Sequence, residues 1–167
     1  MAGDNSGPFD LIVIGSGPGG YVAAIRAAQL GMNVACVEAA ELGGVCLNIG
    51  CIPTKAMLAS AALVNEMKDA EKHGILAKDI TFDLGPAQER SRSVAKQMAK
   101  GIGHLFKKNK VTHLPGHGRL KGAGKVEVEA EEGSKTVYEA AHVIIATGSR
   151  PRDLPVLKID EDRIWSS

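Results

Sequence analysis

The sequence predicts an α/β fold, a parallel β-sheet with crossover helices, and two observations carry that prediction. Residues 9–14 form a short β-branched run that ends at glycine, which is typical of a buried parallel strand. An alanine-rich helix at 19–30 and a second apolar strand at 33–38 then complete a βαβ unit. Such a unit crosses over with a right-handed connection.

The composition is that of one globular domain. The chain has 167 residues, of which 44% are hydrophobic and 23% charged. Lys and Arg number 20 against 19 Asp and Glu, so the net charge of +1 gives no reason to expect a nucleic-acid partner. The first eight residues show no leader pattern, and we see no apolar run of membrane-spanning length. We therefore expect a cytoplasmic protein with no membrane partner.

Two helices are expected in the middle of the chain. The first covers residues 54–68, with Pro53 at its first helical position. The second is longer, begins after a cap at Asp83 and ends near Asn109, because its apolar residues repeat at intervals of three and four.

Strand signals follow these helices. They lie at residues 110–114, 125–130 and 136–140, and they predict a small antiparallel β-meander. Residues 142–146 should return to the sheet as a buried strand, before two prolines and a polar tail. We therefore expect a Rossmann-like domain at 1–150 and a linker at 151–167.

The turn after the first strand has the G-x-G-x-x-G spacing of a phosphate-binding loop. Its residues are Gly15, Ser16, Gly17, Pro18, Gly19 and Gly20. Gly17 would let the backbone approach a pyrophosphate, whose charge the helix N-terminus favours. Glu38 closes the second strand about twenty residues further on, where a carboxylate can accept from ribose hydroxyls. This context predicts a dinucleotide site, with a ligand-free glycine turn as the alternative, and it does not separate FAD from NAD.

Two of the three cysteines form a second signature. Cys46 and Cys51 are separated by four residues that include Gly50. Residues five apart on an ideal helix lie about 7.5 Å apart along its axis, too far for a usual disulfide. Gly50 can relieve this by distorting the entry to the following helix. Cys51 would then lie near the positive end of a helix dipole with Lys55 one turn on, and both effects favour a thiolate.

A reactive, cycling disulfide is our interpretation of this pair. A zinc site is an alternative, although the five histidines show no metal-ligand spacing to it. A structural disulfide and two unrelated buried thiols are the others. Cys36 lies inside the second strand, so we expect it to be a small buried hydrophobe.

Together, the glycine turn, the segment Cys46-Leu-Asn-Ile-Gly-Cys51-Ile-Pro-Thr-Lys55 and the closing Ala-Thr-Gly at 146–148 resemble the pyridine nucleotide–disulfide oxidoreductases. The resemblance covers nearly the whole chain. Within the family, the sequence between the cysteines is most similar to that of the dihydrolipoamide dehydrogenase branch. Val45 and Thr54 depart from the family's usual Thr and Ser.

The resemblance implies that the dinucleotide is FAD, with Glu38 on its adenosine ribose. It implies a cofactor lining that comprises Ala39, Gly43, Gly44, Val45, Cys46, Lys55, Gly118, Ala146, Thr147, Gly148 and Ser149. By the same resemblance, Cys46 is the interchange thiol that meets the substrate and Cys51 lies against the flavin. Lys55 would sit at the flavin's reactive edge. No metal is implied.

The resemblance also implies an NAD⁺-dependent oxidation of dihydrolipoyl groups by a homodimer. The partner would be the lipoyl domain of a 2-oxo acid dehydrogenase complex or of a glycine cleavage system. NAD⁺ would bind a domain that follows residue 167, so we expect this chain to be about the first third of the enzyme and inactive alone. A mercuric or glutathione reductase and a non-catalytic flavin-binding module are the alternatives.

Overall fold

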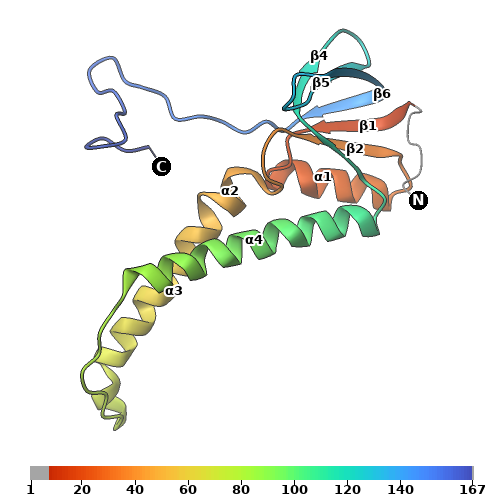
Figure 1. The fold of residues 1–167 in the computed structure, drawn as a ribbon. Coiled ribbons are helices and arrows are strands. Elements are labelled where there is room, and N and C mark those ends of the chain that lie inside the picture. The colour runs from red at the N-terminus through yellow and green to blue at the C-terminus, as the bar shows by residue number, and fades with distance from the viewer. Residues whose placement is uncertain (1–7, 167) are drawn as a thin grey trace.

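The computed structural model describes residues 8–166 and contains one six-stranded sheet of order β3-β2-β1-β6-β5-β4. The sheet is parallel where β1 (Phe9–Ile14) lies between β2 (Val34–Glu38) and the end of β6 (Lys135–Ile145), and where β3 (Thr112–Pro115) pairs with β2. Helix α1 (Pro18–Gln29) crosses over between β1 and β2. The predicted α/β fold with a parallel sheet is confirmed (Figure 1).

The strand β6 belongs to both halves of the sheet. Its first half pairs antiparallel with β5 (Lys125–Glu129), which pairs in turn with β4 (His117–Leu120). Its second half, from Ala140 to Ile145, runs parallel to β1. The meander is therefore β4-β5-β6, and two predictions were wrong. The strand expected at 110–114 became β3 of the parallel sheet, and the strands expected at 136–140 and 142–146 are one strand because no glycine or proline separates them.

The end of β6 is less buried than its apolar sequence suggested. Residues 142–146 were expected to form a buried strand, but Ile144 and Ile145 are 39% and 62% exposed. The reason is that β5 begins at Lys125, opposite Glu139, so within residues 8–166 the last residues of β6 have a paired strand on the β1 side alone. This part of the sheet is an open edge.

The core has two layers, one on each face of the sheet. Helices α1 and α4 (Leu84–Lys108) cover one face, where Val13, Cys36 and Phe106 are buried. The meander covers the other face, where Ile12 and Val126 are fully buried (Figure 1). Neighbouring residues of β1 point to opposite faces, and since both faces are covered the strand is apolar and buried from Leu11 to Ile14.

The helices after β2 form an arm that projects from the sheet. They are α2 (Gly44–Asn48), α3 (Cys51–Lys68), the 3₁₀ turn η1 (Ala70–His73) and the first part of α4, whose last part lies on the sheet. Helix α4 is capped as predicted: Gly85 N donates to Asp83 Oδ1 over 2.9 Å, and Asn109 follows the last turn. Helix α3 begins at Cys51, so Pro53 is its third residue and not, as we predicted, its first. The backbone N–H groups of the first turn have no intrahelical acceptor, so a proline is tolerated at this position.

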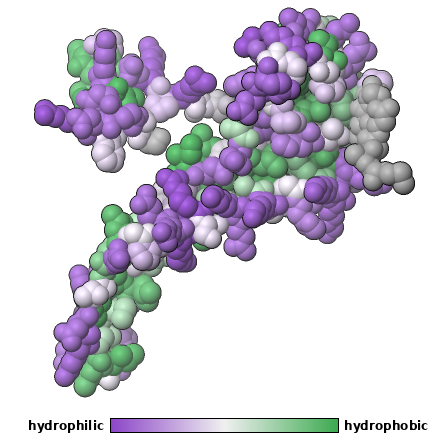
Figure 2. All heavy atoms as spheres, viewed as in Figure 1, coloured by the Kyte–Doolittle hydropathy of each residue, from purple (hydrophilic) through white to green (hydrophobic). Residues whose placement is uncertain are grey.

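Much of the arm's surface is apolar (Figure 2). Leu58, Leu63 and Met67 of α3 are each more than 40% exposed. The helical segment Gly44–Lys68, including its break, is long and apolar enough to cross a membrane by length and composition. This corrects our statement that no stretch reaches that length. Length and composition are weak evidence, since a helix covered by other protein passes the same test.

After β6 the chain leaves the sheet (Figure 1). Residues 146–166 contain no helix or strand, apart from an isolated bridge between Leu154 and Leu157. The division into a domain at 1–150 and a linker at 151–167 stays a prediction.

The packing of α4 on the sheet can be tested at Phe106, which is 2% exposed. We expect Phe106→Ala to lower the free energy of unfolding by about 3–5 kcal/mol, because it leaves a cavity between α4 and the sheet. Phe82→Ala is the matched control: Phe82 is 52% exposed, so its loss should cost less than about 1 kcal/mol. Urea unfolding measures both, and equal losses would contradict this account of the core.

Candidate active site

The glycine turn sits where β1 ends and α1 begins. A Cβ on Gly20 would lie 1.8 Å from Gly15 O, so only glycine lets α1 pack this closely on the turn. Gly17 is the N-cap of α1 and provides no side-chain cap, and nothing lies within 4 Å of a Cβ built on it. The first-turn N–H groups of this 12-residue helix therefore have no side-chain cap, which suits an anionic ligand.

Glu38 faces this turn from the end of β2. Its Oε2 accepts from Ser16 N over 2.8 Å and from Ser16 Oγ over 2.7 Å, and its Oε1 accepts from Ala40 N over 3.0 Å. Burial raises the pKa of Glu38, but the hydrogen bonds from Ser16, Ala40 and Ala39 outweigh burial and hold the pKa below its ordinary value. The carboxylate is thus ionised and fixed beside the turn.

A second turn, at residues 43–44, lies directly on the first. Gly43 N donates to Ser16 O over 3.0 Å and to Ser16 Oγ over 3.2 Å. A Cβ on Gly44 would lie 2.8 Å from Gly17 Cα, so a side chain at this position would push the two turns apart. Because α2 begins at Gly44, the segment that carries the first cysteine is anchored on the glycine turn.

Cys46 and Cys51 form a disulfide, which confirms the predicted pairing. Cys46 lies on α2, a helix the sequence did not reveal, and Cys51 is the first residue of α3. The break between the helices is at Gly50, whose N–H reaches back to Val45 O over 2.8 Å. The Cα atoms of Cys46 and Cys51 are consequently 4.7 Å apart, within the usual disulfide range.

Asn48 is a site residue that sequence reasoning missed. Its Nδ2 donates to Leu42 O and to Gly44 O, each over 3.0 Å, and so ties the end of α2 to the turn before it. Its signal was a lone amide between two cysteines in an otherwise apolar stretch.

The structure brings part of the predicted lining together. Ala146 lies against the turn, since its O is 2.3 Å from a Cβ built on Gly15. Gly118 lies over the ends of β1 and β2, where a Cβ would be 2.9 Å from Ile14 Cγ2. The predicted residues that are exposed are Pro18, Gly19, Ala39, Val45, Lys55, Thr147, Gly148 and Ser149. Within residues 8–166, the side chain of Lys55 makes no hydrogen bond or ion pair, so its predicted role stays untested.

The three thiol positions differ in their surroundings. Cys51 is exposed, Cys46 is half-buried against the core, and Cys36 is a fully buried free thiol, as predicted. Burial, with a smaller contribution from Glu38, raises the pKa of Cys36 to about 12, so this thiol is unreactive at neutral pH.

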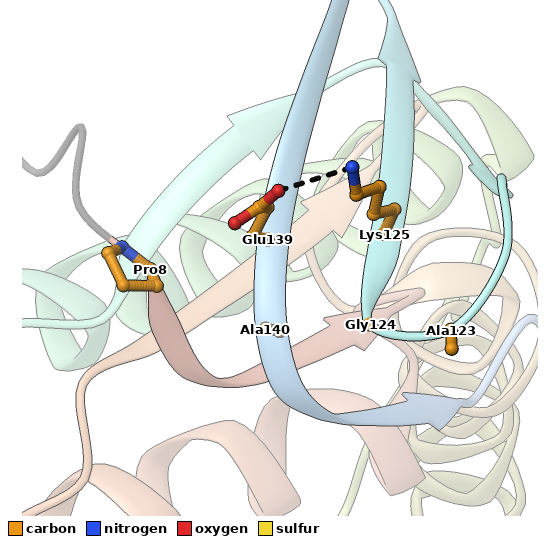
Figure 3. A pocket seen from close by; sticks show the side chains of 6 residues that line it. All are labelled: Pro8, Ala123, Gly124, Lys125, Glu139 and Ala140. Carbon is orange, nitrogen blue, oxygen red and sulfur yellow. Dashed lines mark ion pairs between the residues drawn. The ribbon is translucent and has the colours of Figure 1, made fainter.

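Within the described residues, neither the possible metal ligands nor a surface hollow adds a second site. Within residues 8–166 no group of three or more His, Cys, Asp or Glu side chains is placed to hold a metal ion. A hollow near the start of β1 is lined by Pro8, Ala123, Gly124, Lys125, Glu139 and Ala140 (Figure 3). Its charged groups, Lys125 and Glu139, pair with each other across the strands at 3.4 Å.

The close approach at Gly20 predicts opposite effects for two neighbouring substitutions. Gly20→Ala should destabilise the fold by about 1–3 kcal/mol or more, because its Cβ meets the Gly15 carbonyl. Gly19→Ala places its Cβ in open space within α1 and should stabilise by up to about 1 kcal/mol. Thermal unfolding compares the two variants, and a stable Gly20→Ala protein would refute this geometry.

The depressed pKa of Glu38 predicts a pH dependence. A carboxylate whose folded-state pKa lies below its ordinary 4.5 stabilises the fold fully above that pH, and the stabilisation disappears as the pH falls below it. Wild-type stability should therefore fall more steeply below pH 4.5 than that of Glu38→Gln. Glu41→Gln is the control, since Glu41 is exposed and its carboxylate accepts no hydrogen bond within residues 8–166. Parallel curves for wild type and Glu38→Gln would contradict the role of these hydrogen bonds.

The chain is similar to known proteins in sequence and in fold. The family model for pyridine nucleotide-disulphide oxidoreductases matches residues 9–164. A dihydrolipoyl dehydrogenase of Zymomonas mobilis is 51% identical over 95% of this chain and 34% of its own length. A leghemoglobin reductase of Glycine max is 45% identical over 95% of this chain and 31% of its own. The crystal structure of LpdA from Mycobacterium tuberculosis superposes with a TM-score of 0.81 at 29% identity, over 92% of this chain and 35% of that one.

The chain thus spans about a third of the length of the relatives it matches. The family match covers most of the chain. It agrees with the glycine turn, the disulfide between the paired cysteines and the sheet described above. The chain belongs to the pyridine nucleotide-disulphide oxidoreductase family.

Proposed function

We propose that this chain is the dinucleotide-binding, dithiol-carrying part of a dihydrolipoyl dehydrogenase, which oxidises dihydrolipoyl groups with NAD⁺ as the final acceptor. The observation that carries the proposal is the Cys46–Cys51 disulfide on a segment that packs against the glycine turn. Relatives that bear this enzyme's name at 51% and 47% identity support it.

The residues present fit a bound FAD. The uncapped N-terminus of α1 suits a pyrophosphate, and the open space at Gly17 lets the phosphate oxygens approach the backbone. The Glu38 carboxylate is held in place by Ser16 and Ala40 and retains acceptor capacity for ribose hydroxyls. Bound FAD would supply the two-electron acceptor that reoxidises the cysteine pair.

The cysteines would perform the first half of the reaction by thiol–disulfide exchange. A thiolate of the dihydrolipoyl group attacks Cys46 Sγ, and the Cys46–Cys51 bond breaks with Cys51 leaving as a thiolate. The second substrate thiol then attacks the mixed disulfide, closes the lipoyl ring and releases Cys46. Two electrons and two protons pass from the substrate to the protein.

The position of Cys51 suits it to the role of leaving group. It is the first residue of α3, an 18-residue helix whose positive end favours a thiolate. Lys55 lies four residues on along the same helix and adds a second positive charge near that end. We assign Lys55 the role of stabilising negative charge near the flavin.

The rest of the reaction requires parts beyond this third of the relatives' length. We propose that those parts supply the NAD⁺ site, the dimer contacts and a strand for the open edge of β6 at Ile144 and Ile145. The protein partner we propose is the lipoyl domain of a 2-oxo acid dehydrogenase complex or of a glycine cleavage system.

A half-reaction on this chain tests the proposal. When the oxidised chain is denatured and alkylated, one thiol, that of Cys36, should react. After treatment of the folded chain with dihydrolipoamide, the number of alkylated thiols should rise to three. Cys36→Ala should keep the gain of two thiols, whereas Cys46→Ser or Cys51→Ser should abolish it. Mass spectrometry after alkylation counts the thiols.

The alternatives give different outcomes in the same assay. If dihydrolipoamide is no faster a reductant than glutathione at equal thiol concentration, the substrate assignment is wrong and another disulfide reductase is favoured. If no reductant adds two thiols to the folded chain, the pair does not cycle and the chain is a binding module.

A further inference from the structure

Three consecutive side chains of α4 hydrogen-bond to the backbone around the disulfide. Arg90 Nη1 donates to Ala56 O over 3.2 Å, Ser91 Oγ to Pro53 O over 3.1 Å, and Arg92 Nη1 to Asn48 O over 3.4 Å. We call these three residues the α4 clamp.

The carbonyls held by the α4 clamp lie on both sides of the helix break. Asn48 is the last residue of α2, whereas Pro53 and Ala56 belong to the first two turns of α3. One turn of α4 therefore holds two helices that are otherwise joined by the short 49–50 connection and the disulfide. Ser91 is 3% exposed, so its hydrogen bond is shielded from water.

The α4 clamp matters most when the disulfide is open. In the oxidised chain the disulfide fixes α2 against α3, whereas in the dithiol form the 49–50 connection and noncovalent contacts limit how far Cys46 and Cys51 separate. The closer the two thiols are held, the higher their effective concentration and the more the disulfide is favoured.

We propose that the α4 clamp is a positioning device that keeps the two halves of the redox segment in register while the disulfide is open, and so favours its closure. The proposal rests on the redox cycling proposed above. It adds residues from a helix that carries neither cysteine.

The experiment is a redox titration of the chain with dithiothreitol and its oxidised form. Each reduction moves two electrons and two protons from dithiothreitol, which closes to a cyclic disulfide, to Cys46 and Cys51. We compare wild type with Ser91→Ala and with Arg92→Met, which retains an unbranched side chain but has no donor. Alkylation followed by mass spectrometry gives the fraction of dithiol at each ratio.

Ser91→Ala should shift the equilibrium toward the dithiol by about fivefold, the value of one typical hydrogen bond, and Arg92→Met by about twofold because Arg92 is exposed. Ser93→Ala is the matched control: Ser93 is an exposed serine of the same turn whose hydroxyl makes no hydrogen bond within residues 8–166, and its variant should titrate like wild type. Ser91→Thr retains the hydroxyl and should restore the wild-type equilibrium.

A merely structural role would lower the melting temperatures of the oxidised and reduced forms equally and leave the equilibrium unchanged. Wild-type equilibria in both Ser91→Ala and Arg92→Met would overturn the proposal, as would an equal shift in Ser93→Ala. If Ser91→Ala fails to fold, the exposed Arg92→Met decides alone. A wild-type chain that gains no thiols under dithiothreitol contradicts the proposed function instead, so the two failures are distinct.

Discussion

The site depends on a close approach of backbone segments at a point where side chains do not fit. The turn after β1, the start of α1 and the turn before α2 meet there, and a Cβ on Gly20 or on Gly44 would lie within 3 Å of backbone atoms. Ser16 closes the junction with its hydrogen bonds to Glu38 and Gly43. Because the junction is made of backbone, it places the paired cysteines relative to the glycine turn with little conformational freedom.

The same junction explains why three cysteines in one short chain differ so much. Cys36 lies in the middle of β2, below the junction, where both faces of the sheet are covered and a thiolate is strongly disfavoured. Cys46 and Cys51 lie beyond the junction, on helices that project from the sheet and are partly open to solvent. Reactivity thus follows from the position of each residue along the path from the core to the surface.

The features that sequence predicted well are those that depend on neighbours in the chain. The apolar run of β1, the Asp83 cap and the glycine turn each carry a local signal. Helix α2 carries none, because five residues are too few for a helical period and the helix begins with Gly44 directly after Gly43.

Features that depend on distant segments were missed or misassigned. The residues of β3 do not indicate that the strand pairs with β2. Those of β6 do not indicate where its pairing with β5 stops. The contacts of the α4 clamp were missed for the same reason, since 34 to 44 residues separate the partners. Pairing between remote parts of the chain has no local signature.

Strand β6 is continuous, and so it connects the meander with the parallel part of the sheet. Its first residues lie in the meander beside β5, and the residue after its last, Ala146, donates to Ile14 O and touches the turn at Gly15. The backbone of this one strand therefore joins the antiparallel half of the sheet to the segment beside the glycine turn, and no helix lies on that path.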